Sequence, residues 1–226
     1  MRPTEGILNK KTIKNLQNRL KKNGSKFSYR KIKNKSKKVY EANLTVFNAL
    51  KKSDFDIDGK FSFERYISAH TIMISFEGVP AIYFNSLFGT SNDEAKYIIT
   101  GNNRDVNRYR WNQKVIYNYL KNSKSKQSIF YKNLTNLLSI KMKQKAFHPN
   151  APRKTINMGS KIFCFQRTSI DKKQIIICIT NLSSKDQYLL LDRKFRNWKN
   201  LIDRKIHILP NKKLKLEPFQ TVWLSN

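Results

Sequence analysis

The stretch 69–108 constrains the fold most, because a helix, a strand and a polar loop follow one another in it. Phe61–Phe76 is apolar on nearly all sides, which predicts a largely buried helix. Gly78 is suited to end that helix, and Pro80 prevents its continuation. Val79 with Ala81–Phe84 then forms a short continuous apolar run, as in a parallel strand covered on both faces. An Asn- and Arg-rich loop follows, so polar side chains come just beyond the end of a predicted core strand.

The first fifty residues predict a helix, a basic ribbon and a packed segment. Residues 7–22 carry apolar side chains at helical spacing with a basic opposite face, and Asn23-Gly24 ends the helix. Phe27–Lys38 is the densest run of Lys and Arg. Its interleaved aromatic side chains would suit stacking on single-stranded bases, but such a run is more often an exposed β-ribbon or loop. Val39–Leu50 is apolar enough to pack.

The formal net charge of +31 on 226 residues allows two interpretations. One is a polyanionic partner, such as nucleic acid or an anionic membrane face. The other is biased composition, typical of an AT-rich coding sequence, because Lys outnumbers Arg and Asn and Ile are abundant. The charge is spread along the chain, and Arg, which binds phosphate and base edges best, is the minority. We favour the second interpretation, and keep a nucleic-acid-binding module built on residues 10–38 as the alternative.

Cysteine usage and hydropathy point to a cytoplasmic protein without a membrane span. No apolar run is long enough to cross a membrane, and residues 1–24 lack the apolar centre of a signal peptide. There are only two cysteines. A turn centred near Asp171 would place Cys164 opposite Cys178 across a hairpin, where we expect buried thiols rather than a disulfide.

Two patterns suggest metal chemistry, and both have a simpler interpretation. The run Asp54–Gly59 matches the first half of an EF-hand loop, but its twelfth position is Arg65 instead of a bidentate Glu. We therefore prefer an acidic turn that caps the next helix. His70 lies inside the predicted buried helix with no Cys, Asp or Glu at ligand spacing, which favours a core histidine over a ligand or base. No metal and no cofactor are predicted.

The second half changes from helices to strands near residues 148–152, where two prolines occur within four residues. Helices are expected at Asn112–Leu120 and Ile129–Met142. Six strands of an antiparallel sheet are expected beyond the prolines: Ile162–Thr168, Gln174–Asn181, Gln187–Leu191, Trp198–Leu201, Lys205–Leu209 and Leu214–Leu224. The predicted domains are 1–144, with an inserted segment at about 23–60, and 153–226. The fold class is thus α/β followed by all-β.

Several motifs, in this order and spacing, resemble the sucrose phosphorylase group, including glucosylglycerate phosphorylases, within the α-amylase superfamily (glycoside hydrolase family 13). They are RPTEGIL (2–8), TGNNRDVNR (100–108), KAFHPNAP (145–152), NLSSKDQ (181–187) and EPFQTVWL (217–224). The resemblance implies the C-terminal part of a (β/α)8 TIM barrel, incomplete here, followed by a small antiparallel β domain. In such a barrel the loops after the strands carry the chemistry.

The resemblance also implies an activity and its limits. These enzymes transfer glucosyl from sucrose or a related α-glucoside to phosphate by double displacement, with two carboxyl groups ~5–5.5 Å apart. Their catalytic carboxylates correspond to positions before Met1, so no catalytic residue is predicted here and the chain should be inactive alone. Sugar and inorganic phosphate are the implied partners. A complementary chain that supplies the N-terminal barrel, and an inactive remnant, are the two further alternatives.

The remaining candidate residues are expected to contact the substrate rather than to catalyse the reaction. By resemblance, Arg104 would reach the bound glucosyl unit and Asp105 would hold its guanidinium, although the pair would also fit an ordinary surface ion pair. Tyr40 and Glu41 resemble the mobile acceptor loop, with Tyr40 equally suited to half-buried packing. Lys38 stands where sucrose phosphorylases have Asp, which disfavours sucrose as donor and suits a more anionic acceptor.

Overall fold

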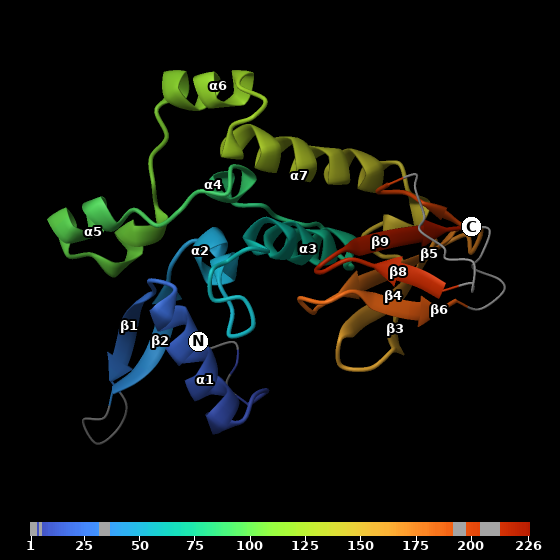
Figure 1. Cartoon of the computed structure of the whole chain (residues 1–226), viewed down its shortest axis with the longest axis horizontal. Coiled ribbons are helices and arrows are strands. Elements are labelled where there is room, and N and C mark those ends of the chain that lie inside the picture. Colours follow the sequence, from blue (N-terminus) through green and yellow to red (C-terminus); the bar gives the residue numbers. More distant parts are fainter. Residues whose placement is uncertain (1–3, 5, 32–36, 192–197, 204–212) are drawn as a thin grey trace. The chain divides into compact units, whose positions relative to one another are not determined.

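A computed structural model describes residues 4, 6–31, 37–191, 198–203 and 213–226 of the 226-residue chain (Figure 1). The chain forms two compact units, each discontinuous in sequence. The first comprises Met1–Ser62 and Tyr83–Phe130, and the second comprises Phe63–Ile82 and Tyr131–Asn226. The predicted division into residues 1–144 and 153–226 follows the change from helices to strands along the chain, and it stays a prediction.

The first unit is built from short helices and one antiparallel hairpin. Its elements are α1 (Lys10–Lys22), β1 (Lys26–Lys31), β2 (Lys37–Asn43), α2 (Val46–Lys51), α4 (Phe84–Leu87), α5 (Glu94–Thr100), the 3-10 helix η3 (Asn103–Asn107) and α6 (Gln113–Lys121). The helix predicted at 7–22 is confirmed as α1 with its end at Asn23, but it begins at Lys10, after the N-cap Asn9. The strands β1 and β2 pair antiparallel and confirm the exposed ribbon, while residues 32–36 lie outside the described residues.

Asparagine side chains hold the first unit together. Asn92 donates to the Gly24 carbonyl at 3.1 Å and accepts from the Thr45 amide at 2.9 Å. The backbone amide of Asn92 donates to the side-chain oxygen of Asn48 at 2.9 Å. The bonds tie the end of α1, the start of α2 and the approach to α5. Gly24 has φ +90, and a Cβ there would come within 2.9 Å of the Asn92 amide nitrogen, so only glycine fits.

The prediction of a strand at Val79 and Ala81–Phe84 is wrong. The residues before α4 have no regular secondary structure, and the Val79 side chain is 83% exposed. Every strand pair among the described residues is antiparallel, so no parallel neighbour is present to bond this segment. A strand buried on both faces forms only where flanking strands take up its backbone groups.

The second unit is a β-sandwich covered on one side by helices. Its elements are α3 (Ser62–Ser75), the later part of α7 (Lys126–Met142), the 3-10 helix η4 (Lys145–Phe147), β3 (Arg153–Asn157), β4 (Ile162–Thr168), β5 (Ile175–Asn181), β6 (Gln187–Leu190), β7 (Lys199–Asn200), β8 (Lys213–Leu216) and β9 (Thr221–Ser225). A five-stranded antiparallel sheet has the order β3-β4-β5-β9-β7, and β6 and β8 form a second sheet. The antiparallel β structure expected after residue 152 is confirmed.

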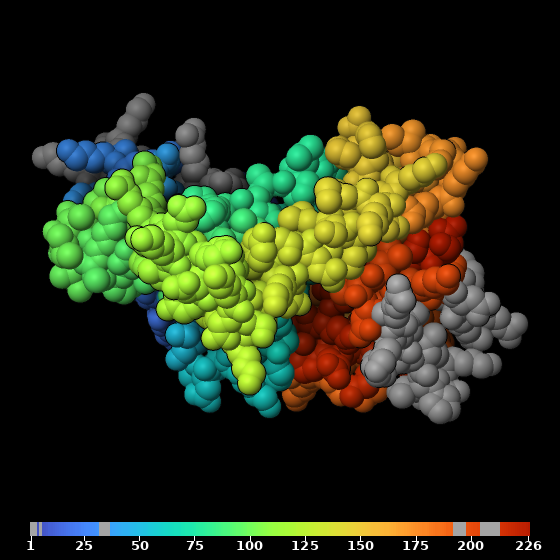
Figure 2. Space-filling view, turned by 90° about the horizontal axis from the view of Figure 1, so that it is seen from above, coloured from blue at the N-terminus to red at the C-terminus, as the bar shows by residue number. Residues whose placement is uncertain are grey.

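The two sheets enclose an aliphatic core. Side chains from one face of β4, β5 and β9 meet Leu214 and Leu216 of β8 in one buried cluster. On the opposite face, the rings of Phe163 and Phe165 contact Phe76, which follows α3. The yellow atoms of the later part of α7 lie beside the orange and red atoms of the strands (Figure 2). The large sheet is therefore buried on both faces, which explains the near-continuous apolar run in β5.

The interpretation of His70 as a core residue is confirmed. It lies on α3, the helix predicted at 61–76, with its ring 4.2 Å from that of Tyr66. Its Nδ1 lies 2.9 Å from the Tyr66 carbonyl, and its side chain is buried. Burial lowers the pKa of His70 below its usual value, because it penalises the charged ring.

The cysteines do not face each other, contrary to the prediction. In the β4–β5 ladder Cys164 pairs with Ile179, and Phe165 pairs with Cys178. Neighbouring residues of a strand point to opposite faces, so the two thiols lie on opposite sides of the sheet. Both are free and buried.

The other differences in the β domain concern strand limits. The strand predicted at Leu214–Leu224 is two strands, β8 and β9, separated by a turn in which the Gln220 amide donates to the Glu217 carbonyl at 3.1 Å. The strand β3 was not predicted, and the strand predicted at Lys205–Leu209 lies outside the described residues.

Candidate functional site

The candidate site lies where η3 meets the β1–β2 hairpin in the first unit. Asn103 donates from its side chain to the Phe27 carbonyl at 3.0 Å and to the Ser28 hydroxyl at 3.3 Å. The Asp93 amide donates to the carbonyl of Val106 at 2.7 Å, and Val106 is fully buried. These contacts fix η3 against the hairpin, and they fix the loop that carries Arg104.

Arg104 and Glu41 form the centre of the site. The Arg104 Nε donates to Glu41 Oε2 at 3.1 Å across 63 positions of sequence. The Arg104 amide is held by the side chain of Asn102 at 3.1 Å, which caps η3. Both charged side chains are partly exposed, at 49% and 36%. Within the described part of the chain the other guanidinium nitrogens of Arg104 have no protein partner, so they remain available to an oxygen-rich ligand.

Asp105 does not hold the Arg104 guanidinium, contrary to the expectation. Its carboxylate lies 3.3 Å from Lys96 Nζ on α5. A hydrogen bond from the Thr100 hydroxyl, with the Lys96 ammonium, holds the pKa of Asp105 below its ordinary value. Asp105 thus ties η3 to α5, and Glu41 takes the orienting position that sequence reasoning gave to Asp105.

Tyr40 sits at an irregularity of the hairpin. The ladder runs from Ser28 opposite Glu41 directly to Tyr29 opposite Val39, so Tyr40 is the extra residue of a β-bulge. The ring is 40% exposed. Bulges re-aim side chains and are frequent beside binding sites. The adjoining ladder sets Lys38 opposite Arg30, and like charges directly opposite destabilise a strand pair.

Sequence reasoning missed the supporting residues. Asn103 and Asn92 carry the bonds that assemble the unit, but single asparagines in loops give no periodic signal. The cue that was present is Asn102, since an Asn directly before a short polar turn is a typical cap.

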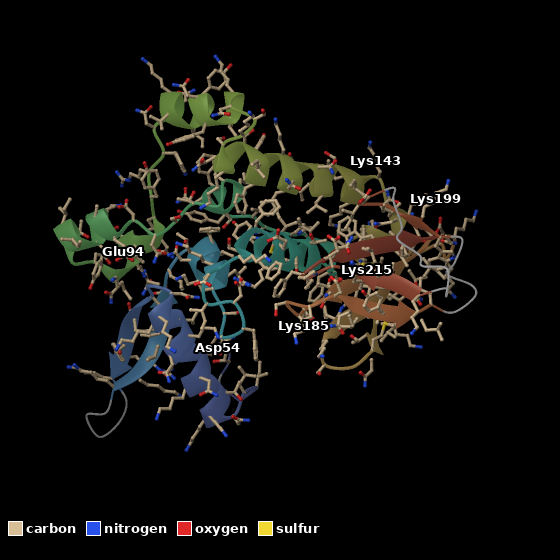
Figure 3. All side chains as sticks on the ribbon, viewed as in Figure 1. Asp54, Glu94, Lys143, Lys185, Lys199 and Lys215 are labelled. Carbon is tan, nitrogen blue, oxygen red and sulfur yellow. The ribbon has the colours of Figure 1, made fainter. Side chains whose placement is uncertain are left out.

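Residues 54–59 form a turn held by Asp56, and that this turn caps α3 stays a prediction. Asp56 accepts from the amides of Lys60 at 2.8 Å and Phe61 at 2.9 Å, just before α3. Asp54, labelled in Figure 3, forms an ion pair with Arg19. Among the described residues no three His, Cys, Asp or Glu side chains are grouped to hold a metal ion.

Three carboxyl groups in the described part of the chain have pKa shifts opposite to the one that a general acid needs. The pKa values of Glu77, Asp105 and Asp171 are all lowered. A glycosidase-type general acid needs a raised pKa. What the site offers is an oriented guanidinium, an exposed phenol and a basic hairpin, which suit binding of hydroxyl-rich or anionic groups.

Comparison with known proteins supplies the context for this geometry. A glucosylglycerate phosphorylase of Escherichia coli (strain K12) is 27% identical over 227 residues, covering 99% of this chain and 39% of that protein. One from Allomeiothermus silvanus is 26% identical over 222 residues, covering 98% of this chain and 38% of that protein. The chain resembles glucosylglycerate phosphorylases. A sucrose phosphorylase of Agrobacterium vitis is 27% identical over 122 residues, which is 54% of this chain and 22% of that protein.

The solved structures agree on the fold. A sucrose 6F-phosphate phosphorylase from Thermoanaerobacter thermosaccharolyticum matches 95% of this chain and 37% of its own, with a TM-score of 0.63 and 16% identity. A variant of AmyP in complex with maltotriose matches 74% of this chain and 35% of its own, with a TM-score of 0.58 and 14% identity. No family model matches the chain. The expected α-amylase-type fold class and the phosphorylase resemblance are confirmed.

The extent of these matches bounds what they imply. The chain spans 31% to 39% of the length of the glucosylglycerate phosphorylases it matches. Within the described residues, no helix is both long enough and apolar enough to cross a membrane.

Proposed function

We propose that this chain supplies the substrate-binding portion of a retaining α-glucoside phosphorylase that transfers glucosyl between an anionic glucoside and phosphate. The observation that carries the proposal is the Arg104 guanidinium, held by Glu41 through its Nε alone. Its outer nitrogens form a planar fork that suits sugar hydroxyls and carboxylate or phosphate oxygens. The likeness to glucosylglycerate phosphorylases supports the same class of substrate.

The basic hairpin favours an anionic acceptor. Arg30 and Lys38 lie opposite each other in the ladder, next to the bulged Tyr40. A phosphate or carboxylate near these residues would be attracted by their positive charges. We therefore propose glycerate-type carboxylates and inorganic phosphate as the groups bound there, with sucrose disfavoured as donor.

The catalytic carboxylates are proposed to come from a complementary polypeptide. The pKa values of Glu77, Asp105 and Asp171 are lowered, which is the wrong direction for an acid catalyst. Removal of catalytic partners that act as a unit typically costs ~10⁴-fold or more in rate. The chain alone should not release glucose 1-phosphate from glucosylglycerate and phosphate. A cytoplasmic location is part of the proposal, supported by the two free buried thiols, which fit a reducing compartment.

The test is the binding of glucose 1-phosphate to the purified chain, monitored by NMR. We expect Arg104→Lys to weaken binding about tenfold or more, as loss of ~1.4 kcal/mol implies. Arg110→Lys is the matched control, since Arg110 is an exposed arginine of the same loop, and it should leave binding unchanged. Equal affinity of the Arg104 variant and the parent would refute the assignment of Arg104.

A second experiment distinguishes this proposal from the alternative of a nucleic-acid-binding module. Lys38→Gln should weaken phosphate and glycerate binding, whereas Lys10→Gln on α1 should not. Tight binding of DNA or RNA at physiological salt, without any binding of the sugar phosphate, would favour the nucleic-acid-binding module instead. Turnover by the chain alone would show that its own carboxylates are catalytic.

A further inference from the structure

The second unit contains a cavity of about 280 Å³ where α3, α7 and the turn between β8 and β9 meet. Among the described residues its lining carries three carboxylates and no lysine, arginine or histidine, although the chain has a formal net charge of +31. The acidic residues are Glu64 on α3, Asp203 after β7, and Glu217 at the start of the turn. The sign of the charge here is the reverse of that of the whole chain, which favours a positively charged ligand.

A buried hydroxyl in the wall of the cavity lacks a hydrogen-bond partner. Ser68 of α3 lines the cavity and is 5% exposed, yet within the described part of the chain its hydroxyl makes no hydrogen bond. The neighbouring Thr71, also buried, donates its hydroxyl to the Ile67 carbonyl at 2.7 Å. A buried polar group without a partner is costly, so a ligand that supplies the missing bond to Ser68 is favoured.

Two of the carboxylates have no ion-pair partner among the residues that the structure describes. They are Glu64 and Glu217. Lys215, labelled in Figure 3, lies near enough to attract Glu217, but its ammonium group is paired with Asp186 at 2.8 Å. The described carboxylates are also not grouped to hold a metal ion. Their arrangement therefore favours an organic cation over a single metal ion.

The turn that carries Glu217 is held by hydrogen bonds. The Glu217 amide donates to Gln220 Oε1 at 2.8 Å, and the side chain of Asn181 on β5 donates to the Glu217 carbonyl at 2.9 Å. Phe219 of the same turn lines the cavity. The buried Arg65 guanidinium, which is not part of the lining, lies 5.2 Å from the centre of the Phe219 ring. These contacts fix the carboxylate-bearing side of the cavity before a ligand arrives.

Apolar side chains form the rest of the wall, and they suit the methylene groups of a ligand. They are Ile67, Leu137, Ile202, Pro218 and Phe219. The volume of the cavity is several times the ~30 Å³ that one water molecule takes up in the liquid, so an organic molecule can enter.

We propose that this cavity binds a small aliphatic ammonium compound, with Glu64 and Glu217 as the groups that bind its charge. Ammonium N–H groups form charge-assisted hydrogen bonds to carboxylates, and the Ser68 hydroxyl is a further acceptor. The methylene groups lie against the apolar wall. This inference does not depend on the proposed function, because the lining belongs to the second unit, whereas Arg104 and Glu41 belong to the first.

The experiment uses the full chain and putrescine, a four-carbon diamine, in calorimetric titrations at low salt. We expect a Kd of about 1 mM or lower, and at least about tenfold weaker binding of the uncharged diol of the same length. Glu217→Gln should weaken putrescine binding about tenfold, because a charge-assisted bond is lost. Glu77→Gln is the matched control, since Glu77 is an exposed glutamate of the same unit outside the cavity, and it should leave the affinity unchanged.

Ser68→Ala tests the unpartnered hydroxyl. Without ligand it should not lower the melting temperature, because the hydroxyl makes no bond within the described chain, and it should weaken putrescine binding about threefold or more. Ser139→Ala, at an exposed position of α7, is the control. Equal affinity for the diamine and the diol, equal affinity of the parent and Glu217→Gln, or no binding of putrescine at ~20 mM overturns the proposal. Loss of glucose 1-phosphate binding in the Arg104 variant leaves these outcomes unchanged.

Discussion

The Arg167 guanidinium of β4 donates to the Ser75 carbonyl at the end of α3, with a nitrogen-to-oxygen distance of 2.6 Å. The same fully buried side chain donates to the carbonyls of His148 at 2.8 Å and Ala151 at 3.0 Å. One cation therefore satisfies the last turn of a helix and the segment that precedes the sheet, which are otherwise distant in sequence.

Replacement of Arg167 should be the most destabilising single change in the second unit. Arg167→Met removes the donor of three carbonyl groups, two of them buried, and we expect a loss of about 3–5 kcal/mol in the free energy of unfolding. Urea denaturation measures it. Arg153→Met is the control, because Arg153 forms a partly exposed pair with Glu77 at 2.8 Å, and should cost under ~1 kcal/mol. Similar losses for the two variants would contradict the role of Arg167.

The half-buried Lys126 predicts a rise in stability at alkaline pH. Its pKa is about 8 in the folded chain and near 10.5 when unfolded, so between these values the unfolded state binds more protons. The free energy of unfolding should therefore rise from pH 8 to pH 10.5. Lys126→Met should be more stable than the parent at pH 7, and the difference should shrink across this window. Chemical denaturation at several pH values tests it, and a constant difference would contradict it.

Asp171 predicts a loss of stability at acid pH. Hydrogen bonds from the Ser169 hydroxyl and the Lys173 amide, with Lys145 nearby, hold its pKa at about 2. The pKa is depressed, so the stabilisation is present above the unfolded value near 4 and is lost as pH falls toward 2. Asp171→Asn should therefore lower the melting temperature at pH 6 but not at pH 2. A variant as stable as the parent at pH 6 would show that this turn does not depend on the carboxylate.

The two cysteines should resist both modification and pairing. Burial raises the pKa of Cys164 to about 12, and it raises the pKa of Cys178 as well. The thiols lie on opposite faces of the sheet, so a disulfide cannot form without unfolding. Reaction with an aromatic disulfide reagent should be slow in buffer and fast in denaturant. Rapid reaction in buffer, or an intramolecular disulfide in the native chain, would contradict the register.

The cysteine register shows where sequence reasoning stops. The strands Ile162–Thr168 and Gln174–Asn181 were predicted almost to the residue, because apolar patterning is local. The turn, however, is centred between Asp171 and Lys172, since the ladder pairs Cys164 with Ile179. A shift of half a residue in the turn changes the pairing by one, and a change of one moves a side chain to the other face.

Other differences have similarly local causes. Four of the five β3 positions, which begin at Arg153, are exposed, so the strand lacks an apolar signature. The segment after Gly78 has the composition of a core strand, but it has no neighbour among the described strands to bond it. The candidate site was predicted in part: Arg104 and Glu41 were both named, and their contact across 63 positions could only come from the fold.

The asparagine bonds of the first unit have a thermodynamic consequence. Most buried apolar side chains lie in the second unit, whereas Asn92 and its partners connect the first through amide groups. Exposure of apolar surface gives unfolding its positive heat capacity, and exposure of polar surface reduces it. The first unit should therefore have the flatter stability curve of the two, varying little with temperature on either side of its maximum.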